Sequence, residues 1–203
     1  MRNTLIAMIL TLLFMGCSTM TPAINEYTIV PPYCTSDNLS APADLTLKLT
    51  PTKSIASLAS KDLYYLRETT HIGSYLYSRW ADTPANMIDR ALTSSLQSRR
   101  LFVTLLPTTS SAAADLALES ELHAFYHRFA NDSKSEGLID ITYHLIDSKT
   151  KKTLASKRFV ITAPAPTQDA AGGVKALSSA TQQLSEETTL WLESIAKEKQ
   201  WIK

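Results

Sequence analysis

The chain has 203 residues, of which 44% are apolar, with 20 Lys and Arg against 19 Asp and Glu and only two cysteines. This length and apolar fraction are typical of one globular domain with a packed core, so the composition excludes a disordered protein and a disulfide-stapled mini-protein. The near-zero net charge and the lack of a basic cluster argue against a protein that binds nucleic acid.

The N-terminal residues have the pattern of a secretory signal. Arg2 precedes an apolar run at residues 5–15. A helix needs about 20 residues to span a bilayer, so this run is too short for a transmembrane segment but matches the apolar core of a signal peptide. We therefore expect the segment to direct export and not to belong to the fold.

A small residue followed directly by cysteine, Gly16-Cys17, resembles the lipobox of bacterial lipoproteins, although Phe14 stands where Leu is usual. The resemblance implies that residues 1–16 are cleaved off and that Cys17 is acylated and becomes the first residue of a lipidated tether, 17–25. Two or three acyl chains attach a protein stably, since each buried CH₂ contributes about 0.8 kcal/mol. The alternative is a plain signal peptide with a chance cysteine.

Two neighbouring features refine this interpretation. Ser18 stands where an Asp is the usual signal for retention in the inner membrane of Gram-negative bacteria, so the resemblance favours the periplasmic face of the outer membrane. Acylation of Cys17 leaves Cys34 without an intramolecular partner. No histidine or basic residue stands beside Cys34 to activate its thiol, so we expect a partly buried structural cysteine.

The first half of the expected domain, residues 26–203, combines short strands with a helix. The expected strands cover residues 27–30, 45–50, 62–67 and 72–80, the last two as a hairpin. Thr83-Pro84 then supplies a helix N-cap and a proline suited to the first helical position. Apolar residues at helical spacing predict that this helix runs to about Arg99.

The second half is expected to begin with strands and to end in a helix. The strands cover residues 101–106, 115–129, 138–146 and 154–161, and the last three read as an antiparallel meander. In the second and third of these strands the inward residues are expected to be Leu116, Leu118, Leu122, Ala124, Ile139, Ile141, Tyr143 and Leu145.

From Thr167 onward the apolar period becomes helical, and Gly172-Gly173 is expected to delay the helix start. Its stripe consists of Val174, Leu177, Thr181, Leu184, Thr188, Trp191 and Ile195. We interpret the stripe as packing on the sheet, with a self-associating coiled-coil face as the alternative. The predicted fold class is α+β, a mainly antiparallel sheet with a mid-chain helix and a long C-terminal helix packed on it.

No arrangement of residues in the sequence predicts catalysis. The chain has no Gly-x-Ser-x-Gly elbow, phosphate-binding glycine loop or Cys-x-x-Cys pair, so we expect no enzyme and no cofactor. His123 and His127 are four residues apart, but in a strand that spacing separates them by about 13 Å, too far to share a metal ion. We expect exposed strand histidines that share a solvated or partner-facing surface with Glu119 and Glu121.

The order of motifs along residues 26–195 resembles the ABC-type transport auxiliary lipoproteins, also called PqiC-type lipoproteins. After the lipobox and the strand at 27–30, the most telling motif is Arg79-Trp80-Ala81-Asp82-Thr83-Pro84. The later motifs in the same order are Asp115-Leu116-Ala117-Leu118, an aromatic segment to Phe129, Leu145-Ile146-Asp147, Phe159 and Trp191-Leu192.

This resemblance implies a non-catalytic accessory subunit of an envelope lipid-transport system. Such subunits accompany a permease, an ATPase and a periplasmic MCE-domain protein, and dock that assembly at the outer membrane to support envelope integrity. Trp80 and Pro84 match the family motif, and we expect structural roles for them, as a buried aromatic residue and a helix start. A homo-oligomeric ring fits a docking role. A direct lipid carrier and a regulator of cell-wall synthesis or outer-membrane assembly remain alternatives.

Overall fold

The structure, a computed structural model, describes residues 22–31, 41–68, 70–131 and 133–202. The expected signal peptide, Cys17 and Cys34 lie outside this part of the chain. The elements in order are β1 (Asn25–Tyr27), β2 (Ala43–Leu49), β3 (Lys53–Ser54), the short 3-10 helix η1 (Ala56–Leu58), β4 (Asp62–Arg67), β5 (His71–Trp80), α2 (Pro84–Arg99), β6 (Phe102–Leu106), β7 (Leu116–Asn131), β8 (Lys134–Asp147), β9 (Thr153–Pro164) and α3 (Ala170–Glu198).

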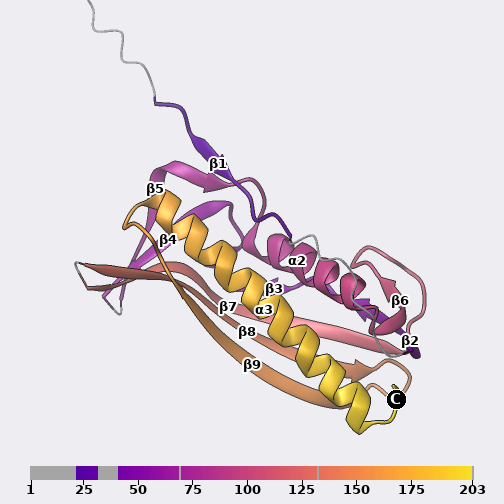
Figure 1. Cartoon of the computed structure of the whole chain (residues 1–203). Coiled ribbons are helices and arrows are strands. Elements are labelled where there is room, and N and C mark those ends of the chain that lie inside the picture. The colour runs from indigo at the N-terminus through magenta and orange to yellow at the C-terminus, as the bar shows by residue number, and fades with distance from the viewer. Residues whose placement is uncertain (1–21, 32–40, 69, 132, 203) are drawn as a thin grey trace, which may run out of the picture.

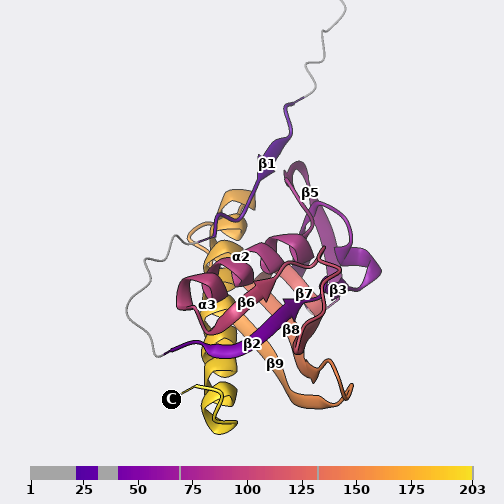
Figure 2. The same cartoon turned by 90° about the vertical axis from the view of Figure 1, so that its right-hand side faces the viewer.

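The strands form one mixed sheet around β7, and both helices cover the same face of it (Figures 1 and 2). On one edge of β7, β8 pairs antiparallel along its length, and β9 pairs antiparallel with β8. The other edge takes β2, β3 and β4 in turn, all of them parallel to β7. On this second side the sheet continues outward from β2 to the parallel β6, and from β4 to the antiparallel β5, which in turn pairs with the parallel β1.

The α+β class is therefore observed, but the sheet is mixed where a mainly antiparallel one was expected. The meander β7–β8–β9 and the β4–β5 hairpin are antiparallel, as predicted. The parallel pairs arise because β2, β3 and β4 follow one another closely in the chain and advance along a single edge of β7. Strands that advance in this way all run in the same direction. Because β7 also runs in that direction, all three pair with it in parallel.

A β-bulge in β7 changes which of its residues face the helices. The register with β8 shifts between Leu122 and Ala124, so His123 is the extra residue. Before the bulge Leu122 is buried; after it Phe125, Tyr126 and His127 are buried, and His127 faces Gly173 of α3. Ala124, which was expected on the inward face with Leu122, is only partly buried and packs at the margin of the core, because a bulge exchanges the two faces of a strand. The inward alternation predicted for β8, from Ile139 to Leu145, is confirmed.

The ends of several elements differ from expectation: β8, for example, begins at Lys134 and not at residue 138. The first strand, β1, ends at Tyr27, where it pairs with Trp80, and Ile29 beyond it is buried in the core outside any strand. The strand predicted at 27–30 therefore lies earlier in the chain. The last strand, β9, extends to Pro164, because it stays paired with β8 as far as Glu136.

The helix α3 packs its predicted stripe on the sheet. Its stripe residues are buried apart from Trp191, which is partly covered and contacts Phe159 of β9 edge-to-face at 6.1 Å. Asp169 caps the helix by accepting a hydrogen bond from the Gly172 backbone N–H at 2.8 Å. Gly172 and Gly173 were expected to delay the start of the helix. Instead, they lie in its first turn.

Two glycines allow α3 to approach the sheet closely. A Cβ atom on Gly137 of β8 would lie 2.6 Å from the backbone nitrogen of Leu177, and a Cβ on Gly173 would lie 2.6 Å from Nδ1 of His127. Neither contact leaves room for a methyl group. The distance between α3 and the strands β7 and β8 is thus set by positions that must carry no side chain.

We expect Gly137→Ala to lower the free energy of unfolding by about 1–3 kcal/mol, the usual cost of overpacking, because the obstructing atoms belong to the helix backbone. Urea denaturation followed by circular dichroism measures this change. The control is Val160→Ile, which adds a methylene to a side chain that is 58% exposed and should stay within about 0.5 kcal/mol of the parent. Equal midpoints for Gly137→Ala and the parent would contradict the close approach.

Candidate functional site

The motif around Trp80 joins three elements at one end of the sheet. The Trp80 indole is buried against Phe125 of β7, with ring centroids 5.7 Å apart. Its backbone N–H donates to the Lys61 carbonyl at 2.7 Å, and the next N–H, of Ala81, donates to the Tyr27 carbonyl at 2.7 Å. The motif therefore connects β1, the β4–β5 hairpin and the start of α2.

The second half of the motif caps α2. Thr83 is the N-cap and Pro84 the first helical residue, as the sequence predicts. Asp82 adds a contribution that sequence reasoning missed: its Oδ1 accepts from the Thr83 N–H at 2.8 Å and from the Asn86 amide at 2.9 Å. The Asn86 hydrogen bond is the main reason that the pKa of Asp82 lies below its usual value. Trp80 and Pro84 thus lie in packing and capping positions, outside the hollows described below.

The two strand histidines lie in different environments, and the expectation that both are exposed is wrong for His127. His123, at the bulge, is half-buried and its Nε2 lies 3.0 Å from the Thr142 hydroxyl. His127 is fully buried under α3 because the bulge turns it inward. Within the described residues no group of three or more His, Cys, Asp or Glu is arranged to hold a metal ion.

His127 is a neutral side chain in the core. Its Nδ1 lies 2.7 Å from the Tyr75 hydroxyl, and its ring lies 4.6 Å from that of Phe129. Its Nε2 has no hydrogen-bond partner within the described part of the chain. Burial lowers the pKa of His127 to about 4, with Asp169 opposing and Arg67 reinforcing the change. The contacts of His127 with Tyr75, Phe129 and Gly173 hold β5, β7 and the first turn of α3 together.

A second polar group, also not predicted, connects β3, α2 and β7. The Thr52 hydroxyl lies 2.5 Å from Oδ1 of Asp89 and 2.6 Å from the Ser120 hydroxyl. The Thr52 N–H also donates to Asp89, at 3.2 Å. Burial raises the pKa of Asp89, and the hydrogen bonds from Thr52 oppose that rise. Because Thr52, Asp89 and Ser120 supply one another's hydrogen-bond partners, we interpret this cluster as a structural connection between these elements.

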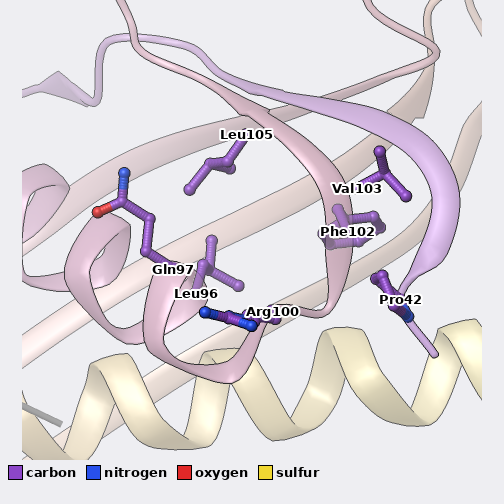
Figure 3. A pocket seen from close by; sticks show the side chains of 7 residues that line it. All are labelled: Pro42, Leu96, Gln97, Arg100, Phe102, Val103 and Leu105. Atoms are coloured by element: carbon purple, nitrogen blue, oxygen red, sulfur yellow. The ribbon is translucent and has the colours of Figure 1, made fainter. Parts of the chain in front are cut away.

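A surface hollow of about 370 Å³ lies between the last turn of α2 and β6 (Figure 3). Its lining is mainly apolar, with two polar side chains, Gln97 and Arg100, at the helix end. Arg100 takes a left-handed conformation, with φ of 48°, as it ends α2. The lining residues are Pro42, Leu96, Gln97, Arg100, Phe102, Val103 and Leu105.

A larger and more polar hollow of about 800 Å³ lies between β2, the start of β7 and the turn after β8. Its lining includes three lysines, Lys48, Lys149 and Lys151, together with acidic side chains. Both hollows are at the end of the molecule that carries β2, β6 and the C-terminus, whereas β1 and β5 are at the opposite end (Figure 1). The hollows therefore lie far from the place where the N-terminal chain joins the fold.

No helix in the described segments is both long enough and apolar enough to cross a membrane.

Comparison with protein families matches residues 27–188 to the model of the ABC-type transport auxiliary lipoprotein component. Among solved structures, a protein from Xanthomonas campestris is similar with a TM-score of 0.79 at 15% identity, covering 87% of this chain and 98% of that one. An uncharacterized protein matches with a TM-score of 0.66 at 13% identity, covering 84% and 99%. A hypothetical protein from Chlamydia trachomatis has a TM-score of 0.54 at 8% identity, covering 75% and 98%. At these identities the likenesses show the fold alone. The search of curated proteins found no match.

The buried His127 predicts a specific dependence of stability on pH. Its pKa is about 4 in the folded protein, against 6.5 for an ordinary histidine, so between these pH values the unfolded chain binds a proton that the folded protein does not. The free energy of unfolding should therefore fall by about 1–3 kcal/mol as the pH decreases from 6.5 to 4.

Urea titrations at a series of pH values test this slope in the parent and in two variants. His127→Gln should lose this part of the slope, whereas His123→Gln, at a half-buried position on the same strand, should keep it. A slope that is the same in all three proteins would show that His127 does not titrate as its burial predicts.

Proposed function

Because the chain belongs to the ABC-type transport auxiliary lipoprotein family, we propose that it is the lipid-anchored, non-catalytic accessory subunit of an MCE-type ABC lipid-transport system. In this role it docks the system at the periplasmic face of the outer membrane and supports envelope integrity. The observation that carries the proposal is the family match over residues 27–188, directly downstream of the lipobox-like Gly16-Cys17.

The anchor that we propose is the acylated Cys17, exposed when residues 1–16 are removed. Asn25, the first residue of β1, is eight positions after Cys17, and an extended chain of that length reaches about 28 Å at most. The tether 17–25 therefore keeps the β1–β5 end of the domain close to the membrane. The end that carries β2 and β6 is then directed toward the periplasm (Figure 1).

This orientation supports the hollow beside Arg100 as the surface that a periplasmic MCE-domain protein contacts. Its floor is apolar, and Val103 at its margin is 58% exposed although it is a large apolar side chain. An apolar centre with a polar rim is the usual arrangement of a protein interface. Arg100 adds a charged group of the kind that often contributes strongly to such contacts.

A direct lipid carrier is the second candidate, because the same hollow is apolar and falls within the range of about 300–1,000 Å³ that small-molecule sites occupy. Native mass spectrometry of the full chain separates the two candidates. A retained acyl lipid that a Leu105→Asp variant loses would favour the carrier, and a lipid-free spectrum would favour the docking subunit.

Membrane fractionation tests the anchor. We expect Cys17→Ser to move the protein from the membrane fraction to the soluble periplasmic fraction, because a single side chain carries the acyl groups. Cys34→Ser is the matched control and should leave the distribution unchanged. An unchanged membrane fraction for Cys17→Ser would contradict the proposed anchor.

Affinity purification from crosslinked membranes tests the partner. The parent chain should recover an MCE-domain protein, and Val103→Asp should reduce the recovery about tenfold, because it puts a charge into an apolar contact at the proposed interface. Val160→Asp, equally exposed but on β9, is the control and should recover the partner normally. Recovery of unrelated proteins alone would rule out the proposed partner.

A further inference from the structure

The strand β5 is irregular at the place where β1 joins it. Its register with β4 shifts between the pairs Tyr64–Ser74 and Asp62–Arg79, so β5 has extra residues in this stretch. Within this stretch Tyr75 contacts His127 in the interior, and Ser78 is buried. The two residues between them, Leu76 and Tyr77, both face solvent.

Leu76 and Tyr77 are large apolar side chains that are exposed to solvent. Leu76 is 77% exposed and Tyr77 is 46% exposed. Ile24, which is 51% exposed, directly precedes Asn25, and Asn25 pairs with Ser78, the residue that follows Tyr77. The parallel register therefore places Ile24 beside Tyr77 on the neighbouring strand. Three large apolar side chains are thus exposed at the end of the sheet that receives the N-terminal chain.

We propose that Ile24, Leu76 and Tyr77 form a membrane-contact patch that rests in the headgroup region of the bilayer holding the anchor. The patch rests on the proposed function, since it requires an acylated Cys17. Three side chains are too few to hold the protein on a membrane alone, so the patch orients a domain that the acyl chains already attach.

The length of the preceding chain argues for a bilayer as the occupant. Ile24 is seven residues from Cys17, so its Cα lies at most about 25 Å from that of the acylated residue. An acylated cysteine lies at the bilayer surface, and the patch is therefore never more than about that distance from the headgroups. The short tether thus holds these exposed apolar side chains within reach of the bilayer that carries the anchor.

The chemistry of the patch also suits an interface between lipid and water. Tyrosine is enriched at that level of the membrane because its ring is apolar and its hydroxyl stays hydrated. Glu26 and Arg79, which lie two residues after Ile24 and Tyr77 in β1 and β5, are paired, with Arg79 Nε donating to Glu26 Oε1 at 2.9 Å. An ion pair of this kind enters the headgroup region at a lower desolvation cost than a single unpaired charge.

Site-directed fluorescence tests the proposal on the full-length acylated chain. A thiol-reactive fluorophore is attached to Leu76→Cys, or to the control Val103→Cys, which is 58% exposed at the opposite end of the molecule. Both variants carry Cys34→Ser so that one thiol reacts. The labelled proteins are reconstituted into phosphatidylcholine vesicles with or without brominated acyl chains, which quench fluorophores that reach them.

We expect the Leu76 label to lose about half of its emission in brominated vesicles, since interfacial apolar surfaces insert by about 5–10 Å, and the Val103 label to keep its emission. If the protein floats with the vesicles but the two labels are quenched alike, or neither is quenched, the patch proposal is overturned while the anchor stands. If the protein does not float, the anchor proposal fails, and the patch proposal fails with it.

Discussion

The fold depends on the edge of β7 that faces away from β8, because buried backbone N–H and C=O groups need partners along its length. Three short strands share this edge, with β2 near its start, β3 in the middle and β4 near its end. One after another along the edge, they supply hydrogen-bond partners to the backbone of β7, and all three run parallel to it. The rest of the sheet follows from that arrangement, since β6 attaches to β2, and β5 with β1 attaches to β4.

This division separates the molecule into two ends with different surfaces. The polar contacts of Thr52, Asp89 and Ser120 hold β3 and α2 at the middle of β7, between the two groups of strands. On one side the β4–β5–β1 group receives the N-terminal chain and exposes Leu76 and Tyr77. On the other side β2 and β6 border the hollows. The proposed docking role would use one end at the membrane and the other at the protein partner.

Sequence reasoning succeeded where a local pattern and the packing agree, as in the alternation of β8, the Thr83 cap of α2 and the buried stripe of α3. It could not predict the parallel pairing, because alternation reports which face of a strand is buried and says nothing of its neighbour's direction. The bulge at His123 carries no glycine or proline to reveal it. The Trp80–Pro84 motif was recognisable, whereas the exposure of Leu76 and Tyr77 follows from a register between distant segments.

The parallel pairing of β1 with the end of β5 determines how the domain bears a pulling force on its N-terminal chain. A load applied through the N-terminal residues reaches the domain along β1, and interstrand hydrogen bonds lie across the strand direction. The load therefore shears the bonds of this pair together and does not open them one after another. Tyr27, whose carbonyl accepts from Ala81, passes the same load to the turn that begins α2. A three-residue strand can in this way act as a strain-bearing joint between a surface and the domain.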